Sequence, residues 1–327
     1  MNEKLFAPGA RVAFLGDSIT HAGRAVAYIQ KYYLEHFPER KVKLYNCGIG
    51  GDTAAGCIGR LDYSLDMCRP TEAVVMFGVN DLHAGYYRPD ATPEQRAQNL
   101  AIRRRHTENM KKLVRGLSER GLPVTFCSGV GRDGFTPGEI GETESAAGMS
   151  EALALAYDEN RQAITGAKNT VDYRTPFQAL QKACAERGLP SLFQPDRTHP
   201  NNIGQEIMAR IFLAGQGLPV LLPTAEDFAE GYCEAALSPE LTETLRRGSG
   251  LADIAFIYPH QANRCPGLDL AGRIAYWQAE AEKLTEDTPG NRYMRSMIRH
   301  YAEHAPCEEK LREEYRAAVD ALYAKNR

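Results

Sequence analysis

The sequence has no apolar stretch long enough to cross a membrane and no block of basic residues. A membrane-spanning helix needs roughly 20 consecutive apolar residues, and no window of the 327-residue chain approaches that length. The net charge is −3, and the densest positive cluster is Arg103–Arg105. This cluster lies in a helical pattern and is typical of a solvated helix face. These absences argue against a membrane protein and against a nucleic-acid partner.

Metal-binding and disulfide patterns are also missing. The eight cysteines are scattered without a C-x-x-C pair, and no H-E-x-x-H segment or Cys/His cluster indicates a metal site. The first ten residues lack the apolar core of a secretory signal. We therefore expect a cytoplasmic protein with reduced, mostly buried thiols and with neither a metal nor a cofactor.

Short apolar runs alternate with helical patterns over the first 215 residues. Runs of this kind, bounded by glycine and proline, predict buried strands at residues 12–15, 42–45, 73–77, 124–127 and 170–173. Apolar residues spaced three and four apart predict helices between them, at residues 26–33, 58–65, 110–117 and 203–211. Such alternation implies a parallel sheet with helices on both faces. The sequence therefore predicts a three-layer α/β domain with about five strands.

Two segments depart from this alternation. Residues 129–148 are rich in glycine and predict a long loop, which at this length is either functional or disordered. Helical spacings dominate after residue 220, and the strand-like run Ile254–Tyr258 is the exception. We therefore expect one domain over residues 1–220 and a mainly helical extension over residues 221–327.

The extension carries apolar seams that must be buried. It could act as a lid, as a contact within a homodimer or as a packed buttress. We favour the buttress or the dimer contact, because two-fold dimers are the commonest oligomers. Trp277, the single tryptophan of the chain, is expected to lie in a helix–helix core of this extension.

Ser18 stands where the first predicted strand ends and a helical pattern begins. Parallel α/β sheets bind ligands at the carboxyl ends of their strands. A helix N-terminus also offers free N–H groups and a partial positive charge to an anion. The position suits a nucleophile, although a serine there is also a common helix N-cap.

A second candidate group lies far along the chain, where Asp196 precedes His199 by three residues. A serine hydroxyl needs a base to remove its proton, and a histidine serves near neutral pH. The histidine in turn needs an acceptor on its other ring nitrogen to fix its tautomer, and Asp196 is placed to supply it. The competing interpretation is a turn capped by the aspartate, with an incidental exposed histidine.

Two further segments follow the second and third predicted strands. Gly48–Thr53 is rich in glycine, which lets the backbone approach a ligand closely and allows the Gly51 N–H to face it. Gly78–Asp81 contains Asn80, whose side-chain amide is a neutral hydrogen-bond donor. Both groups could stabilise an oxyanion, although each segment by itself could be a simple tight turn.

These four segments together resemble the four sequence blocks of the SGNH/GDSL hydrolase family. Gly16–Ile19 is similar to the nucleophile block, Gly48–Thr53 to the glycine block, Gly78–Asp81 to the asparagine block, and Asp196–His199 with the following Pro-Asn-x-x-Gly to the last block. The resemblance covers about residues 8–215. It implies a flavodoxin-like sheet of order 2-1-3-4-5 and a catalytic set of serine, glycine, asparagine and histidine. Family members are esterases, lipases, thioesterases or carbohydrate deacetylases.

The combined interpretation is a serine esterase. Ser18 would attack the ester while His199, oriented by Asp196, acts as base. The N–H groups of Ser18 and Gly51 and the side chain of Asn80 would hold the oxyanion. The alternatives are a lipase or thioesterase that acts on longer acyl chains, and a catalytically silent ligand-binding protein with the same fold.

A small-molecule ester is the expected substrate. We expect short acyl groups, acetyl above all, because no contiguous apolar loop would line a groove for a long chain. An acetylated sugar would suit the tyrosines after the third strand. The weaker candidates for substrate contact are His21, His83, Tyr86, Tyr87 and Arg88.

Overall fold

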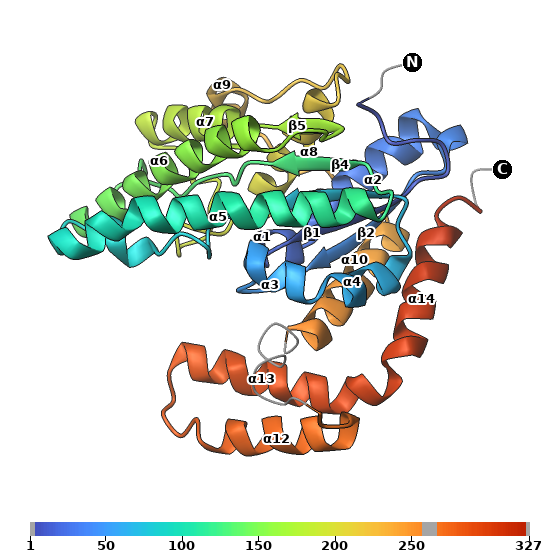
Figure 1. The fold of residues 1–327 in the computed structure, drawn as a ribbon. Coiled ribbons are helices and arrows are strands. Elements are labelled where there is room, and N and C mark those ends of the chain that lie inside the picture. Colours follow the sequence, from blue (N-terminus) through green and yellow to red (C-terminus); the bar gives the residue numbers. More distant parts are fainter. Residues whose placement is uncertain (1–3, 257–266, 325–327) are drawn as a thin grey trace.

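Five parallel strands form the centre of the structure, a computed structural model that describes residues 4–256 and 267–324 (Figure 1). Their order across the sheet is β2-β1-β3-β4-β5. The strands are β1 (Arg11–Gly16), β2 (Lys43–Gly48), β3 (Glu72–Met76), β4 (Val124–Cys127) and β5 (Asn169–Val171). Each of the five runs predicted over the first 215 residues overlaps one of these strands, and the predicted α/β class and the order 2-1-3-4-5 are confirmed.

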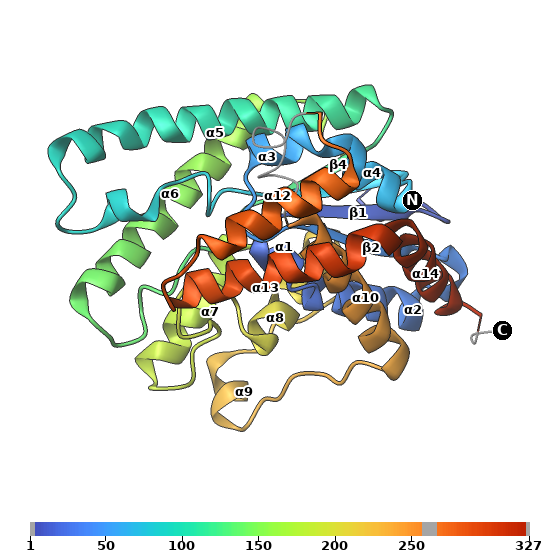
Figure 2. The same cartoon turned by 90° about the horizontal axis from the view of Figure 1, so that it is seen from below.

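Helices lie on both faces of the sheet. The first part of the chain forms α1 (Ser18–His21), α2 (Arg24–His36), α3 (Ala54–Gly59), α4 (Leu61–Cys68), α5 (Pro93–Glu119), α6 (Ile140–Ala163), α7 (Arg174–Glu186) and α8 (Asn202–Gly215), with the 3-10 turns η1 (Pro38–Arg40) and η2 (Ala84–Tyr87). The later part forms α9 (Ala225–Ala229), α10 (Pro239–Ala255), α12 (Leu270–Glu282), α13 (Pro289–His304), η3 (Ala305–Cys307) and α14 (Glu308–Ala321). Figures 1 and 2 show α12 and α13 side by side as a hairpin below the sheet.

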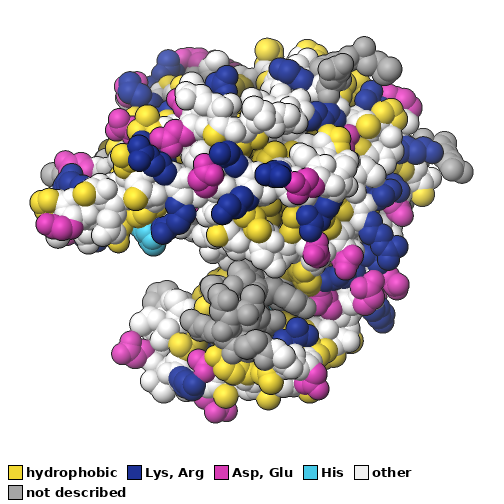
Figure 3. Space-filling view, viewed as in Figure 1, with side chains coloured by type: hydrophobic (Ala, Val, Ile, Leu, Met, Phe, Trp, Pro, Cys, Tyr) yellow, Lys and Arg dark blue, Asp and Glu magenta, His cyan; other side chains and the backbone are white. Residues whose placement is uncertain are grey.

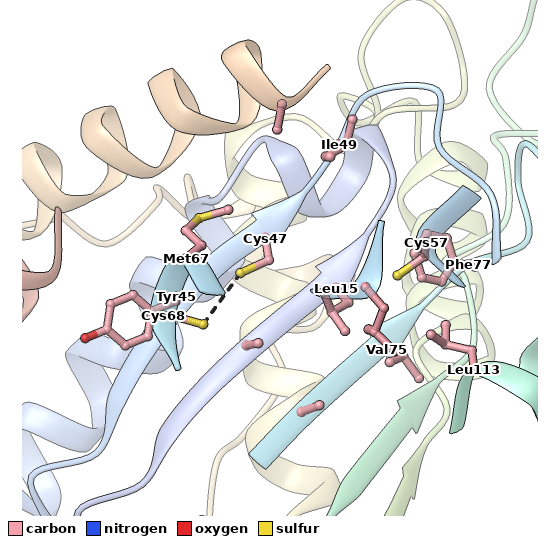
Figure 4. Close-up of a cluster of buried hydrophobic side chains, with 14 of the residues drawn as sticks. Leu15, Tyr45, Cys47, Ile49, Cys57, Met67, Cys68, Val75, Phe77 and Leu113 are labelled. Carbon is pink, nitrogen blue, oxygen red and sulfur yellow. Dashed lines mark hydrogen bonds between the residues drawn. The ribbon is translucent and has the colours of Figure 1, made fainter. Parts of the chain in front are cut away.

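Successive residues of each strand point to opposite faces of the sheet and build two cores. Val12 and Phe14 of β1 pack in one core with residues of α2, α7 and α8. Ala13 and Leu15 pack in the other core with residues of α3, α4 and α5. Figure 4 shows part of this second core. The two cores explain the three layers: helices, sheet and helices.

The described cysteines are free thiols, and most of them lie in these cores. The sulfur atoms of Cys47 and Cys68 lie 3.9 Å apart and form the hydrogen bond that Figure 4 marks with a dashed line. Cys233 and Cys307 are exposed, and Cys265 lies outside the described residues. The buried thiols are those of Cys47, Cys57, Cys68, Cys127 and Cys184.

Most of the helical extension, from α10 to α14, packs in the core of α3, α4 and α5, whereas Ala225 of α9 lies in the other core. Leu251 and Ile254 of α10 and Tyr315 and Val319 of α14 are buried in the core of α3, α4 and α5. Both helices contact β2, one of the two edge strands of the sheet. Trp277, predicted to be a core residue, is buried in the same core. The extension is therefore a buttress of the sheet within one chain, while the division at residue 220 stays a prediction.

The glycine-rich loop after β4 is shorter than predicted. Residues 129–139 form a loop, but α6 begins at Ile140, so the prediction of a loop over 129–148 is wrong in its second half. A Cβ on Gly148 would lie 3.3 Å from the Tyr87 Cβ. Glycine at this helix position therefore permits close packing of η2 and does not break the helix.

Two other predicted elements also differ from the structure. Ile254 and Ala255 end α10, so the predicted strand at 254–258 is wrong in its first residues, while residues 257 and 258 lie outside the described part. Ile254 is apolar because α10 presents it to the core, and a short apolar run does not distinguish a strand from a buried helix. The helical pattern at 58–65 is split at Arg60 into α3 and α4.

The surface carries charges of both signs. Figure 3 shows acidic and basic side chains interspersed over one face of the molecule. Arg103 forms an ion pair with Glu159, whereas Arg104 and Arg105 are exposed on α5, which agrees with the predicted solvated helix face. Within residues 4–256 and 267–324, no helix combines the length and the apolar composition that a membrane crossing requires.

Candidate active site

The register of the sheet brings three of the predicted segments to one edge. Gly16 at the end of β1 is level with Gly48 at the end of β2, and β3 ends beside them. The segments that follow these strand ends carry Ser18, Gly51 and Asn80. Parallel strands place their carboxyl ends at one edge because every crossover returns the chain to the same side.

Glycines at two strand ends let α1 lie directly over the sheet edge. A Cβ on Gly48 would lie 2.4 Å from the His21 backbone nitrogen, and a Cβ on Gly16 would lie 2.1 Å from Thr20 Oγ1. Neither distance accommodates a side chain. Asp17 caps α1 by accepting a hydrogen bond from the Ile19 N–H at 3.0 Å. These contacts fix the start of α1, where Ser18 lies.

Ser18, His199 and Asp196 form a continuous hydrogen-bonded array. Ser18 Oγ lies 2.7 Å from His199 Nε2, and His199 Nδ1 lies 2.6 Å from Asp196 Oδ2. A carboxylate only accepts, so the Nδ1–H donates to Asp196 and Nε2 is free to accept the serine proton. The side chains of His199 and Asp196 are 34% and 48% exposed, so a substrate can reach the array.

The backbone of the Asp196 turn holds the carboxylate in place. Asp196 Oδ1 accepts the N–H groups of Thr198 and His199, both at 2.9 Å. Burial by itself would raise the pKa of Asp196, but these N–H donors and the His199 ring lower it below its ordinary value. The carboxylate thus stays ionised beside the histidine, as the orientation of a neutral imidazole requires.

The glycine-rich loop, residues 129–139, packs against the same turn. Arg197 has a left-handed backbone, with φ of 59°, and its guanidinium donates to the carbonyls of Asp133, Thr136 and Pro137 at 3.1, 2.8 and 3.0 Å. Burial would raise the pKa of Asp133, but hydrogen bonds from Thr136, Ser191 and Phe135 lower it. The loop therefore anchors the Asp196–His199 turn, a role that the sequence did not reveal.

The predicted oxyanion donors have defined surroundings. Gly51 has φ of 72°, a left-handed conformation that favours glycine, and a Cβ there would meet nothing within 4 Å. Among the described residues, its N–H has no acceptor. Asn80 Nδ2 donates one hydrogen to the Asp52 carbonyl at 2.9 Å, which leaves its second hydrogen for another acceptor.

These segments also carry three aspartates whose side chains are buried, Asp17, Asp52 and Asp81. Burial raises the pKa of Asp17 to about 7, and the neighbouring Asp81 and Asp52 add to the rise. Burial also raises the pKa of Asp52, and its ion pair with Arg60 offsets only part of that rise. Asp81 accepts the Ala54 N–H at 3.2 Å and thereby ties the asparagine segment to the start of α3.

His21 is enclosed between the glycine segment and the extension. Its Nδ1 lies 3.2 Å from the Gly50 backbone nitrogen, and its Nε2 lies 3.1 Å from Asp253 Oδ1 of α10. Both ring nitrogens thus already have partners within the chain. Substrate contact by His21 stays a prediction, and only the faces or the edge of the ring remain available for it.

The other weaker candidates cluster at η2. The rings of His83 and Tyr86 are 5.3 Å apart. Tyr86 and Tyr87 pack partly buried against a small core formed with α5 and α6, and burial raises the pKa of Tyr87. Arg88 is exposed and lies 3.1 Å from Asp90. Arg88 lines the same cleft as Asp196, and contact of these residues with substrate stays a prediction.

A cleft of about 520 Å³ is lined by Asp196 of the array together with residues of the glycine-rich loop. Its lining is mostly charged and carries side chains of both signs. Arg132 turns into it from the loop and donates from Nε to Thr198 Oγ1 at 2.9 Å. The charged residues that line the cleft are Arg88, Arg132, Glu139, Glu142, Asp196 and Arg197.

Two buried polar residues that support the site were missed by the sequence analysis. Arg60 donates to Asp52 Oδ2 at 2.7 Å and to the carbonyl of Cys47 at 3.3 Å. His106 of α5 lies 3.2 Å from Asp81 Oδ1. The sequence signal for such a residue was a charged or polar side chain among apolar residues of a helical pattern. Arg60, between Ile58 and Leu61, is an example. Among the described residues, no cluster of three or more His, Cys, Asp or Glu side chains is arranged to hold a metal ion.

Comparison with known proteins identifies the class first and then the family. The matched family model defines the class, a carboxylic ester hydrolase, and the sheet gives it an α/β fold. Residues 14–207, more than half of the chain, match the GDSL-like Lipase/Acylhydrolase family, and the chain belongs to that family.

Individual relatives cover different parts of the chain. An acetylxylan esterase from Geobacillus stearothermophilus is 24% identical over an alignment of 223 residues, and the match covers 63% of this chain and 93% of the relative. A solved variant of Axe2, an acetyl xylan esterase from the same organism, has a TM-score of 0.51 at 20% identity and covers 68% of this chain and 100% of its own.

One solved structure also spans the extension. BT4096, described as a gut microbial diltiazem-metabolizing enzyme, has a TM-score of 0.71 at 16% identity and covers 98% of this chain and 96% of its own. Identity this low shows a shared fold only. The fold of the sheet together with the helical extension therefore occurs in another protein.

Proposed function

We propose that this ester hydrolase is a serine esterase that removes small acyl groups, above all acetyl, from the hydroxyl groups of a polar alcohol such as a carbohydrate. The observation that carries the proposal is the array Ser18–His199–Asp196, with contacts of 2.7 and 2.6 Å. A nucleophile, a base and an orienting carboxylate are thereby in hydrogen-bond reach of each other.

The reaction follows from the positions of these atoms. Ser18 Oγ attacks the ester carbonyl carbon as His199 Nε2 takes the hydroxyl proton. The N–H groups of Ser18 and Gly51 and the Asn80 amide stabilise the oxyanion. His199 then gives its proton to the departing alcohol, and the acyl group stays bound to Ser18. Water, deprotonated by His199, attacks this acyl group and releases the acid and the free serine.

The cleft beside the triad favours a polar alcohol over a long acyl chain. It is lined mostly by charged side chains, which a hydrocarbon chain would leave without hydrogen-bond partners, whereas sugar hydroxyls both donate and accept. The acetylxylan esterase relatives point to the same class of ester. A lipase or a long-chain thioesterase is the second candidate, and a panel of esters distinguishes it.

Active-site labelling tests the mechanism. We expect a fluorophosphonate to form one adduct, on Ser18, and Ser18→Ala to lower kcat for p-nitrophenyl acetate by about a thousandfold or more. Asp196→Asn should lower kcat by about 10²- to 10⁴-fold, because an amide facing Nδ1 stabilises the wrong tautomer. Ser118→Ala, at an exposed position of α5, serves as the control and should keep full activity.

Two outcomes would contradict the proposal. An adduct on another residue would remove the mechanism, and equal hydrolysis by the wild type and Ser18→Ala would indicate a ligand-binding protein without turnover. For the substrate, kcat/KM should fall from acetyl to octanoyl esters, and acetylated xylo-oligosaccharides should release acetate. A rise of kcat/KM with chain length would favour the lipase alternative.

A further inference from the structure

His21 connects the glycine segment to the helical extension through both of its ring nitrogens. The Gly50 N–H can only donate, so His21 Nδ1 is its acceptor, at 3.2 Å. The ring hydrogen is therefore on Nε2, which lies 3.1 Å from Asp253 Oδ1. The His21 side chain is 13% exposed and that of Asp253 28%. His21 thus contacts the glycine segment with one ring nitrogen and the extension with the other.

The Gly50 amide adjoins the peptide whose N–H is the proposed oxyanion donor. Ile49 donates to the Gly16 carbonyl at 2.9 Å, and Asp52 donates to the Ile49 carbonyl at 3.2 Å. These bonds fix the two ends of the turn, and His21 fixes its middle through Gly50. The Gly51 N–H, which follows, is left without an acceptor among the described residues and is free to face an oxyanion.

The extension also holds Gly50 from the outside. A Cβ on Gly50 would lie 3.3 Å from Tyr293 Oη of α13 and 3.4 Å from the ring of Phe256, the residue after α10. The two aromatic rings pack edge to face with centroids 5.5 Å apart. The turn thus lies between α1 beneath it and the extension above it, and a two-residue glycine sequence, flexible by nature, is confined.

Without a partner, the negative charge of Asp253 would be destabilising at its position in the helix. It lies in the last turn of α10 (Pro239–Ala255), where the helix dipole disfavours a carboxylate. The His21 N–H offsets this cost. α10 approaches the same residue a second time, because Ser249 Oγ lies 3.5 Å from the His21 carbonyl, which also accepts from Asn46 Nδ2 at 2.9 Å.

We propose that Asp253 is a positioning residue of the active site: acting through His21 and Gly50, it holds the Gly51 N–H in the orientation that binds the oxyanion. The inference rests on the proposed function, because it assumes that an oxyanion forms on a substrate attacked by Ser18. The family match ends at residue 207, so this support comes from a part of the chain outside the matched region. Asp253 itself does not touch the substrate.

Substitutions at Asp253 test the proposal in the full-length protein. Asp253→Ala removes the acceptor, and kcat for p-nitrophenyl acetate should fall about ten- to a hundredfold while KM changes little, since a displaced donor acts on the transition state. Asp253→Asn keeps an oxygen acceptor for Nε2–H and should keep kcat within about threefold of the wild type. Glu313→Ala, at an exposed position of α14, is the control.

Titration with a fluorophosphonate gives the fraction of active sites, so kcat is expressed per active site and partial unfolding does not imitate the effect. If Asp253→Ala keeps the wild-type kcat while Ser18→Ala is inactive, the positioning role is overturned and the esterase mechanism stands. If Ser18→Ala stays active, both are overturned.

A second pair of variants covers the case in which Asp253→Ala does not fold. The Oδ1 of the shorter side chain in His21→Asn can take the place of Nδ1 and accept the Gly50 N–H, whereas His21→Ala removes the acceptor. We expect kcat to be about tenfold higher for His21→Asn than for His21→Ala. Equal values for the two variants would overturn the proposal.

Discussion

The candidate triad depends on how single side chains are fixed by nearby backbone. Asp196 is held by two N–H groups of its own turn and by the His199 ring. Ser18 follows Asp17, a buried aspartate that caps α1 and lies near two other carboxyl groups. The site therefore contains one carboxylate, Asp196, whose charge the structure stabilises, and one, Asp17, whose charge it disfavours.

Asp17 should make the stability of the fold depend on pH. Burial raises its pKa to about 7, above the 3.8 of an unfolded chain, so the native state binds a proton that the unfolded state has lost between these values. The free energy of unfolding therefore falls as the pH rises toward 7. Asp17→Asn keeps the oxygen that caps Ile19 and is never charged. We expect it to raise the free energy of unfolding on the order of 1–4 kcal/mol at about pH 8.

Urea denaturation at several pH values measures this effect. The stability difference between Asp17→Asn and the wild type should shrink toward zero at about pH 4, where the wild-type carboxyl is neutral in the folded state. A difference that is the same at both ends of the range would show that Asp17 does not titrate as its burial implies.

At the scale of elements, a buried ion pair organises the turn between β2 and α3. Arg60 interrupts the helical pattern between α3 and α4 and directs its guanidinium to Asp52, with side chains 3% and 0% exposed. The same guanidinium donates to the carbonyls of Cys47 and Gly16. One side chain thus joins the ends of β1 and β2 to the glycine segment.

Removal of Arg60 should be strongly destabilising. Arg60→Ala leaves the Asp52 carboxylate buried without its partner, and we expect the free energy of unfolding to fall by about 3–5 kcal/mol. Thermal and urea unfolding measure the loss. Arg115→Ala breaks an exposed pair with Glu119 and should leave stability almost unchanged. Equal effects of the two substitutions would contradict the assigned role of Arg60.

At the scale of the whole molecule, the extension and the sheet share one core. α10 and α14 cover β2, the sheet edge, and Tyr315 Oη accepts the Asn46 N–H at 3.0 Å. A sheet edge that is covered in this way is protected from pairing with other chains. The extension therefore contributes to the stability of the part that carries the candidate triad.

A chain shortened to residues 1–220 should not remain a soluble monomer. It would expose the core residues of β2 and α4 that α10 and α14 bury, and exposed apolar faces of this kind lead to association. We expect aggregates by size-exclusion chromatography with light scattering, and a loss of esterase activity. A soluble, active monomer would show that the sheet needs no buttress.

The sequence by itself determined the sheet and the composition of the site. Buried parallel strands are continuous apolar runs, so all five strands were located by composition, and the resemblance in four short segments gave the strand order. The same segments contain Ser18, His199 and Asp196, which the structure brings together. These features were predictable because each depends on a local pattern or on the common edge of parallel strands.

Tertiary contacts decided the rest. Ile254 and Ala255 form the end of a helix because α10 packs on β2, and their apolar character fits either element. Three features join residues of different segments. Arg60 points into the core, Arg197 contacts the glycine-rich loop, and His21 contacts Asp253. Local periodicity carries no information on such pairs, because their free energy arises only when the chain has folded.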